Sequence, residues 1–196
     1  FFDVFTKTFS CKELDFTDSA ISDGDLDSFK ILKRINGSLI LKNCKNLTRL
    51  DGLENITLIE RDLVLSGLNL KELNTLNSLK SVNQLQIAYM DKLESISGLN
   101  SLERLKSKLL ISHCRMLDTI NGFGNLMDVG NIEITKTRLP ECGFLRHVFE
   151  HHNHFNGAIR LTDNALKSIR CMQGLTEVKS SFFLHQNSLQ TLEGLE

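Results

Sequence analysis

The residues best suited to catalysis form an H-x-x-E-H pattern at positions 147–151. Two histidines four positions apart share one face of a helix, where their imidazoles can bind zinc while the glutamate acts as a general base in hydrolysis. Such a site also needs a third ligand from another helix and a substrate cleft, and the residues after His151 continue a different pattern. We therefore expect the polar, His-rich face of an amphipathic helix. We predict no catalytic residue, no metal and no cofactor, so the chain is not expected to be an enzyme.

The cysteines and the N-glycosylation sequons are candidates for metal binding, redox chemistry or covalent modification. The chain has five cysteines and no C-x-x-C pair, which gives no support to a zinc ribbon or a thioredoxin-like redox site. Candidate N-glycosylation sites are Asn36, Asn46 and Asn55, each of which begins an Asn-x-Ser/Thr sequon. Because about two sequons are expected by chance at this composition, they add little weight to secretion.

The composition restricts the class of partner. A formal net charge of -1 gives no reason to expect nucleic acid as a partner. Uninterrupted apolar runs are only a few residues long, so no direct membrane insertion of this segment is expected. We expect residues 1–196 to form one domain and to be a fragment of a longer chain, because the last residues stop within a recurring phrase.

An internal repeat reveals the elements that would position any site. Eight segments contain an apolar-x-apolar phrase, and seven of them carry an apolar residue a few positions earlier. The first strand residues fall at positions 14, 39, 63, 85, 109, 132, 159 and 182. The alternation predicts a short strand in each repeat, and the regular spacing of about 23 residues predicts a stack of similar coils.

The second half of each repeat places apolar residues about three positions apart, as at Leu47, Leu50 and Leu53. A glycine precedes the last apolar residue at positions 52, 98, 122, 174 and 194, and we expect a positive φ at this corner. One such coil cannot bury its apolar side alone. The pattern predicts an α/β repeat solenoid, a right-handed coil of about eight leucine-rich repeats with one parallel β-sheet face.

One segment interrupts the repeat. Spacing widens between the strands that begin at 132 and 159, and Pro140 lies where a helix could begin. Apolar residues at 144, 145, 148 and 149 then follow helical spacing. We predict a short inserted helix over residues 140–152, on the side away from the sheet.

Two features of the repeats resemble a known family. A strand begins within the phrase Ile35-Asn36-Gly37-Ser38-Leu39, and Leu47, Leu93 and Leu117 fall eight residues after their strand starts. Over roughly residues 11–196 the chain resembles leucine-rich repeats of the receptor L-domain type, as in insulin- and growth-factor-type receptors and related fungal and protist surface proteins. The resemblance implies protein binding at a cell surface or outside the cell. The Cys-rich modules and kinase of those receptors are absent, so their signalling chemistry is not implied.

The repeat assigns places to the cysteines. Cys44 and Cys114 occupy the same inward place as Asn164 and Asn187, where a donor satisfies backbone groups of a turn. They lie three coils apart, too far for a disulfide, so both are expected to be buried free thiols. Cys142 and Cys171 fall in adjacent coils and are candidates for a disulfide, with paired and unpaired states equally open.

The outward sheet surface is the remaining candidate site. The middle residue of each apolar-x-apolar strand points away from the core. The predicted protein-binding face consists of Ile40, Val64, Gln86, Leu110, Glu133, Arg160 and Phe183. An equally weighted interpretation is that these residue types merely favour strands.

The leading functional expectation is a non-enzymatic recognition module of an extracellular or cell-surface glycoprotein that binds another protein through this face. The alternative is an intracellular, cytoplasmic leucine-rich-repeat scaffold or regulatory subunit, which free cysteines and their odd count favour. A metal-dependent hydrolase ranks third.

Overall fold

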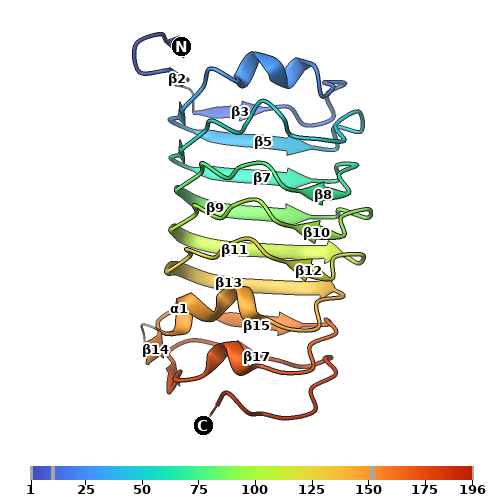
Figure 1. Ribbon diagram of the computed structural model, residues 1–196, viewed down its shortest axis with the longest axis vertical. Helices are drawn as coiled ribbons and strands as arrows, with labels where there is room; N and C mark the ends of the chain where they lie inside the picture. The colour runs from blue at the N-terminus through green and yellow to red at the C-terminus, as the bar shows by residue number, and fades with distance from the viewer. Residues whose placement is uncertain (1, 10–11, 151–152, 196) are drawn as a thin grey trace.

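The computed structural model describes residues 2–9, 12–150 and 153–195. These residues form a parallel-strand solenoid of about seven turns with one short helix. Figure 1 shows the coils stacked along the long axis, with the N-terminal and C-terminal coils at opposite ends. Eight successive strands of the stack bound these turns, which is why about seven turns are found instead of the predicted eight.

One long sheet runs down the stack, and neighbouring coils pair in parallel. Its principal strands are β3 (Glu13–Asp15), β5 (Ser38–Lys42), β7 (Asp62–Ser66), β9 (Ser81–Ala88), β11 (Arg104–Cys114), β13 (Asp128–Thr137), β15 (Ile159–Thr162) and β17 (Phe182–Phe183). The shorter strands β4 (Arg34–Ile35) and β6 (Leu58–Ile59) extend it at the corner before each main strand. At the N-terminal end, β1 (Phe2–Asp3) and β2 (Thr8–Phe9) form an antiparallel pair, and β2 joins β4.

The register confirms the repeat spacing. Each predicted strand start lies directly opposite the next one along the chain, in the series Leu14, Leu39, Leu63, Leu85, Leu109, Ile132, Ile159 and Phe182. A shift of one residue would have turned the inward side chains of a strand outward.

The return path of each coil is built mostly from strands and turns. A second parallel sheet contains β8 (Glu72–Leu73), β10 (Ser95–Ile96) and β12 (Thr119–Ile120), and β14 (His154–Phe155) pairs with β16 (Glu177–Val178). Short 3-10 segments occupy this side at η1 (Asp25–Phe29), η2 (Gly143–Leu145) and η3 (Arg170–Met172). The described chain is therefore mostly β, and the predicted α/β class overstated its helical part.

Apolar side chains from the main sheet and the return path meet in one continuous core. Leu47, Leu93 and Leu117 are fully buried, as is Ile96 in a central coil. In the last coil the equivalent inward residues Leu192 and Leu195 are 61% and 39% exposed, since no described coil lies beyond them.

The inserted helix is shorter than predicted. Helix α1 (Arg146–Glu150) follows η2, and Pro140 lies outside both elements. Residues 140–142 precede both elements, and they are tied to the next coil by a hydrogen bond from Lys167 N to the Pro140 carbonyl (2.9 Å) and by the disulfide of Cys142. The predicted apolar face is confirmed, since Val148 and Phe149 are buried. Residues 151–152 lie outside the described part of the chain.

The corner glycines act in two ways. Gly52 and Gly194 have the predicted positive φ, 108° and 112°. For Gly98 and Gly122 that prediction is wrong, because the following residues Leu99 and Phe123 take the positive φ, 71° and 65°. Glycine is still required at 122, since a Cβ there would lie 2.2 Å from the Gly98 carbonyl oxygen of the preceding coil.

Candidate protein-binding face

The seven residues of the predicted face lie in one row across the sheet. Successive members are paired in register from Ile40 in β5 to Phe183 in β17, through Val64, Gln86, Leu110, Glu133 and Arg160. Six are half-buried, and Phe183 is 37% exposed. Their alternation with fully buried neighbours such as Leu39 and Leu41 places the row on the outer surface of the sheet.

The charged members of this row have partners within the molecule. Glu133 accepts from Lys108 Nζ at 2.6 Å, and Arg160 lies over the Phe183 ring with its guanidinium carbon 4.4 Å from the ring centroid. These contacts compensate the charges at the C-terminal end of the row. Toward the other end the row presents Ile40 and Val64 on adjacent strands, with Leu110 two strands further along.

A second row, at the ends of the strands, was missed by the sequence analysis. Each residue four positions after a strand start has a φ between 53° and 62°: Asp18, Asn43, Gly67, Tyr89, His113, Lys136, Asp163 and Gln186. We call this the strand-end row. The positive φ turns the backbone at the next-to-last residue of the strand or shortly after its end, while the backbone N–H still bonds the next coil, as in Asn43 N to Ser66 O (2.8 Å). Asp, Asn, His and Gly at five of these eight places are the residue types that favour this conformation, a signal that could have revealed the row.

Three members of the strand-end row contact one another across neighbouring coils. The Tyr89 and His113 rings stack with centroids 4.5 Å apart, and Lys136 Nζ lies 3.0 Å from His113 Nε2. Burial lowers the pKa of His113, and the charges of Lys136 and Arg115 lower it further. The imidazole is therefore neutral at pH 7, and its Nε2 accepts a hydrogen bond from the Lys136 ammonium.

The residue directly after each strand-end residue points inward, and several of these residues donate a hydrogen bond to a backbone carbonyl of the preceding coil. Cys44 Sγ donates to Phe16 O (2.9 Å), Asn164 Nδ2 to Ile134 O (2.9 Å) and Asn187 Nδ2 to Leu161 O (2.7 Å). Cys114 lies in the same place, and its thiol is free and buried, like that of Cys44. Burial raises the pKa of Cys114 to about 11, so its thiol has no nucleophilic character at neutral pH.

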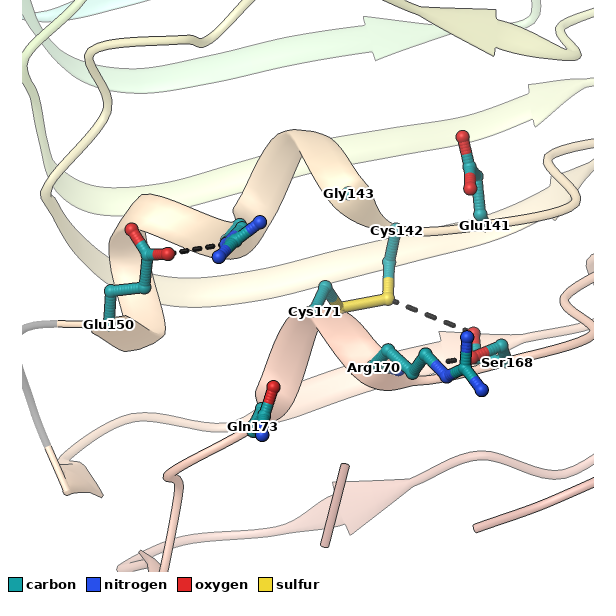
Figure 2. A pocket seen from close by; sticks show the side chains of 9 residues that line it. Glu141, Cys142, Gly143, Glu150, Ser168, Arg170, Cys171 and Gln173 are labelled. Atoms are coloured by element: carbon teal, nitrogen blue, oxygen red, sulfur yellow. Dashed lines mark hydrogen bonds and ion pairs between the residues drawn. A yellow bond between two sulfur atoms is a disulfide. The ribbon is translucent and has the colours of Figure 1, made fainter. Parts of the chain in front are cut away.

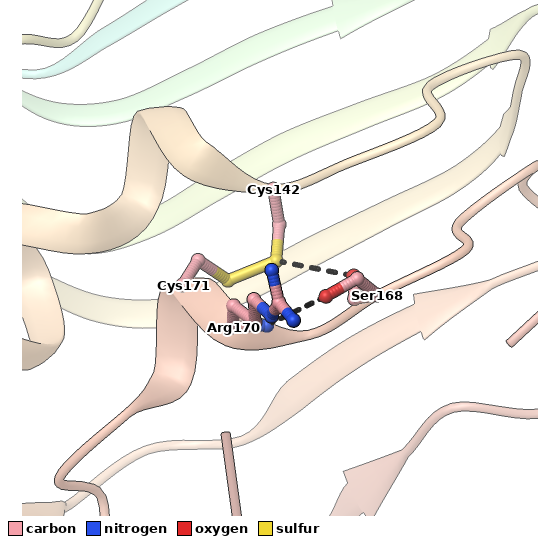
Figure 3. The surroundings of a disulfide bond; sticks show 4 residues. All are labelled: Cys142, Ser168, Arg170 and Cys171. Atoms are coloured by element: carbon pink, nitrogen blue, oxygen red, sulfur yellow. Dashed lines mark hydrogen bonds between the residues drawn. A yellow bond between two sulfur atoms is a disulfide. The ribbon is translucent and has the colours of Figure 1, made fainter. Parts of the chain in front are cut away.

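A disulfide joins Cys142 and Cys171, with the two Cα atoms 5.7 Å apart. Figure 3 shows the bridge between η3 and the start of η2, next to Ser168. Cys142 Sγ lies 4.0 Å from Ser168 O, which is a contact and not a hydrogen bond because the oxidised sulfur carries no proton. The bridge ties the inserted segment to the following coil.

An open cleft of about 560 Å³ lies over this disulfide. Figure 2 shows Glu150 and Arg170 on opposite sides of the cleft. Glu150 is paired with Arg146, and Arg170 is paired with Glu193 (2.6 Å). Both guanidinium groups therefore already have carboxylate partners. The cleft offers no thiol, because its cysteines are oxidised.

Two residues of the H-x-x-E-H pattern, His147 and Glu150, lie in helix α1. His147 Nδ1 is 3.1 Å from Glu150 Oε2, so the glutamate pairs with its own helix. His151 and His152 lie outside the described residues, and His154 is in β14. Within the described ranges, no group of three or more His, Cys, Asp or Glu side chains could hold a metal ion.

The sequons lie in the first full coil and the corner after it. Asn46 and Asn55 are exposed, whereas Asn36 is half-buried. Asn46 Nδ2 donates to Ala20 O (3.0 Å) and Asn55 Nδ2 to Lys30 O (2.9 Å), which in each case uses one of the two amide hydrogens. Glycosylation of these residues stays a prediction.

Among the described residues, no helix combines the length and apolar character needed to cross a bilayer. A comparison of the sequence with models of known protein families and with curated proteins gives no match.

Proposed function

We propose that this chain is a non-enzymatic module that recognises another protein through its main sheet. The observation that carries the proposal is the row in which Ile40 and Val64 stand side by side on the outer surface, in register with Leu110 two strands away. Strands are about 4.8 Å apart, so the three side chains extend over roughly 14 Å. Gln86 lies between Val64 and Leu110 in this row. Apolar groups that alternate with a few polar residues over this distance are compatible with the centre of a protein interface.

We further propose that the solenoid is a leucine-rich-repeat domain of the receptor L-domain type. Support comes from the leucines eight residues after their strand starts, Leu47, Leu93 and Leu117, which are all fully buried. The Cys and Asn donors that bond the preceding coil are also consistent with this type. In repeat solenoids the exposed sheet commonly binds protein.

For the compartment, we propose the cell surface or the extracellular space. The Cys142–Cys171 disulfide supports this, because such bonds persist in oxidising environments. The free thiols of Cys44 and Cys114 favour the second candidate, an intracellular scaffold. Thiol titration of the denatured, unreduced protein separates the two, since a count of five thiols would contradict the disulfide and favour the cytosol.

Substitution of Ile40 and Val64 by Asp tests the binding face. The wild-type chain, the double variant Ile40→Asp with Val64→Asp, and a control, Ile31→Asp with Met127→Asp, are used to capture partners from cells that express the protein. Ile31 and Met127 are 55% and 47% exposed and lie outside the row, so the control makes the same chemical change elsewhere.

We expect the wild type and the control to retain the same protein and the face variant to lose it. Thermal unfolding of all three checks the fold, since an outward strand position contributes only about 1 kcal/mol. Retention of that protein by a folded face variant would refute the sheet face as the binding site.

A further inference from the structure

Three cations gather at the edge of the sheet, beyond the row just described. Lys136 belongs to the strand-end row, and Arg115 and Arg138 each lie six positions after a strand start in consecutive coils. The pairing of Cys114 with Thr137 places the two arginines on adjacent turns. His113, which precedes Arg115 by two residues, joins the group through its contact with Lys136. We call Arg115, Lys136 and Arg138 the basic edge.

The basic edge has no carboxylate partner in the part of the chain that the structure describes. Arg34, Lys108 and Arg170, by contrast, each form an ion pair with a residue of the next coil. Burial is the largest cause of the lowered pKa of His113; the charges of Lys136 and Arg115 lower that pKa further, and the charge of Asp163 raises it.

An exposed aromatic ring adjoins the basic edge. Tyr89 is 57% exposed and stacks on His113, so one flank of the ring is held and the remainder faces solvent. Leu110 lies three residues before His113 in β11, a distance of about 10 Å along an extended strand. One short ligand segment can therefore contact the cations, the Tyr89 ring and the apolar row together.

Acidic residues limit the basic edge on both sides. Asp91 occupies the place of Arg115 one coil earlier, and Asp163 occupies the place of Lys136 one coil later. A long polyanion such as a nucleic acid would pass over one of these carboxylates, which costs Coulomb energy. A short acidic segment fits between them.

We propose that the basic edge binds an acidic segment of the partner protein, with Tyr89 and Leu110 contacting an apolar residue of the same segment. This inference rests on the proposed function and names the chemistry of its partner. Complementary charges at the border of an interface steer association and orient the partner on the apolar centre.

The test uses a fluorescein-labelled synthetic peptide rich in Glu and Leu, and a matched peptide with Lys in place of Glu. Fluorescence anisotropy at low ionic strength measures binding to the wild type, to Lys136→Glu with Arg138→Glu, and to Lys71→Glu with Arg104→Glu. The last pair is exposed and makes the same change in net charge elsewhere on the molecule. A second variant, Arg115→Gln with Arg138→Gln, removes two charges at exposed positions outside the strand-end row.

We expect the wild type and the control to bind the Glu peptide, and reversal at the basic edge to weaken that binding at least tenfold while favouring the Lys peptide. Equal affinity of the control and the basic-edge variants for the Glu peptide would overturn the inference, as would no binding by the wild type. Heparin and a single-stranded oligonucleotide are run as competitors. Displacement by either at the same charge concentration would show a general anion patch and refute an acidic protein segment.

The outcomes are separable from those of the proposed function. The peptide assay needs no captured partner. If the Ile40→Asp, Val64→Asp variant loses the captured protein while charge reversal at the basic edge leaves binding of the Glu peptide unchanged, only the basic edge is refuted. Capture that survives this variant, together with peptide binding that is lost on charge reversal, would refute only the sheet row.

Discussion

Replacement of Gly122 by Ala tests how closely the coils stack at the return corner. A Cβ at position 122 would lie 2.2 Å from Gly98 O and 3.6 Å from Ile96 Cγ2. The first distance is shorter than any normal carbon–oxygen contact, and its other atom belongs to backbone that no side-chain rotation can move. The corner of one coil must therefore shift away from the coil before it.

The free-energy cost follows from what that shift disturbs. Overpacking of a tight interior costs about 1–3 kcal/mol. The same corner is held by Asn121 N to Ile96 O (2.9 Å) and Gly122 N to Ile96 O (3.1 Å), and each such bond contributes about 1 kcal/mol. The alanine offsets about 0.4–1 kcal/mol by restricting the unfolded chain. We expect the free energy of unfolding to fall by about 2–4 kcal/mol.

Urea denaturation followed by circular dichroism measures this change. The matched control is Gly143→Ala, because a Cβ at 143 meets nothing within 4 Å. Gly143 also begins a helical segment, where Ala is favoured, so the control should be neutral or slightly more stable. A Gly122→Ala variant within about 0.5 kcal/mol of the wild type, a difference expected of harmless surface changes, would refute the close approach of the two coils.

Three further predictions concern the core and the cysteines. Leu93 is fully buried, so Leu93→Ala should lower the free energy of unfolding by about 2–5 kcal/mol in the same denaturation assay, and a loss below about 1 kcal/mol would contradict its burial. Reduction of the Cys142–Cys171 bond, which closes a loop of 29 residues, should lower it by about 3.5 kcal/mol, measured with and without reductant. Cys114 should resist alkylation in the native protein at pH 8, because its pKa is about 11. Since that pKa exceeds the unfolded value, stability should be full below about pH 8.5 and fall as the pH rises toward 11; rapid native alkylation would contradict this.

The stack of coils could be predicted from two periodic patterns in the sequence, the alternation of apolar residues within each strand and the repeat of about 23 residues. Alternation within each strand determines which residues face inward, and the recurrence of the phrase determines which residues pair. Leu39 opposite Leu63 and Leu109 opposite Ile132 follow from these two facts alone. Leu93 and Ile96 belong to the apolar residues that recur about three positions apart, and both are fully buried.

The return path was harder to predict because its conformation depends on the neighbouring coil. The apolar spacing around Leu93 and Ile96 suits a helix-like return, yet Ser95–Ile96 is a strand because it pairs with the coils on both sides. Pro140 could begin a helix by its own φ preference. Its carbonyl bonds Lys167 N instead, and the helix begins only after the bridged Cys142.

The candidate site also has a part that the sequence predicts and a part that it does not. Alternation sufficed to place Ile40, Val64 and Leu110 on the outer face. It could not show that Lys108 would neutralise Glu133, because that contact joins residues 25 positions apart and depends on the length of each coil. The positive φ of Lys136 was also hidden, since lysine does not favour that conformation.

The basic edge follows from the geometry of repetition. In a stack of equal coils, residues at the same offset become neighbours, so Arg115 and Arg138 bring like charges together on adjacent turns. Elsewhere in the molecule, residues of opposite charge face each other on adjacent turns, as in the pairs Arg34 with Glu60 and Arg104 with Asp128, so no such repulsion arises there. Like charges in register destabilise the free protein slightly. An acidic ligand neutralises both arginines when it binds and so removes their repulsion. The relief of this repulsion adds to the free energy of binding.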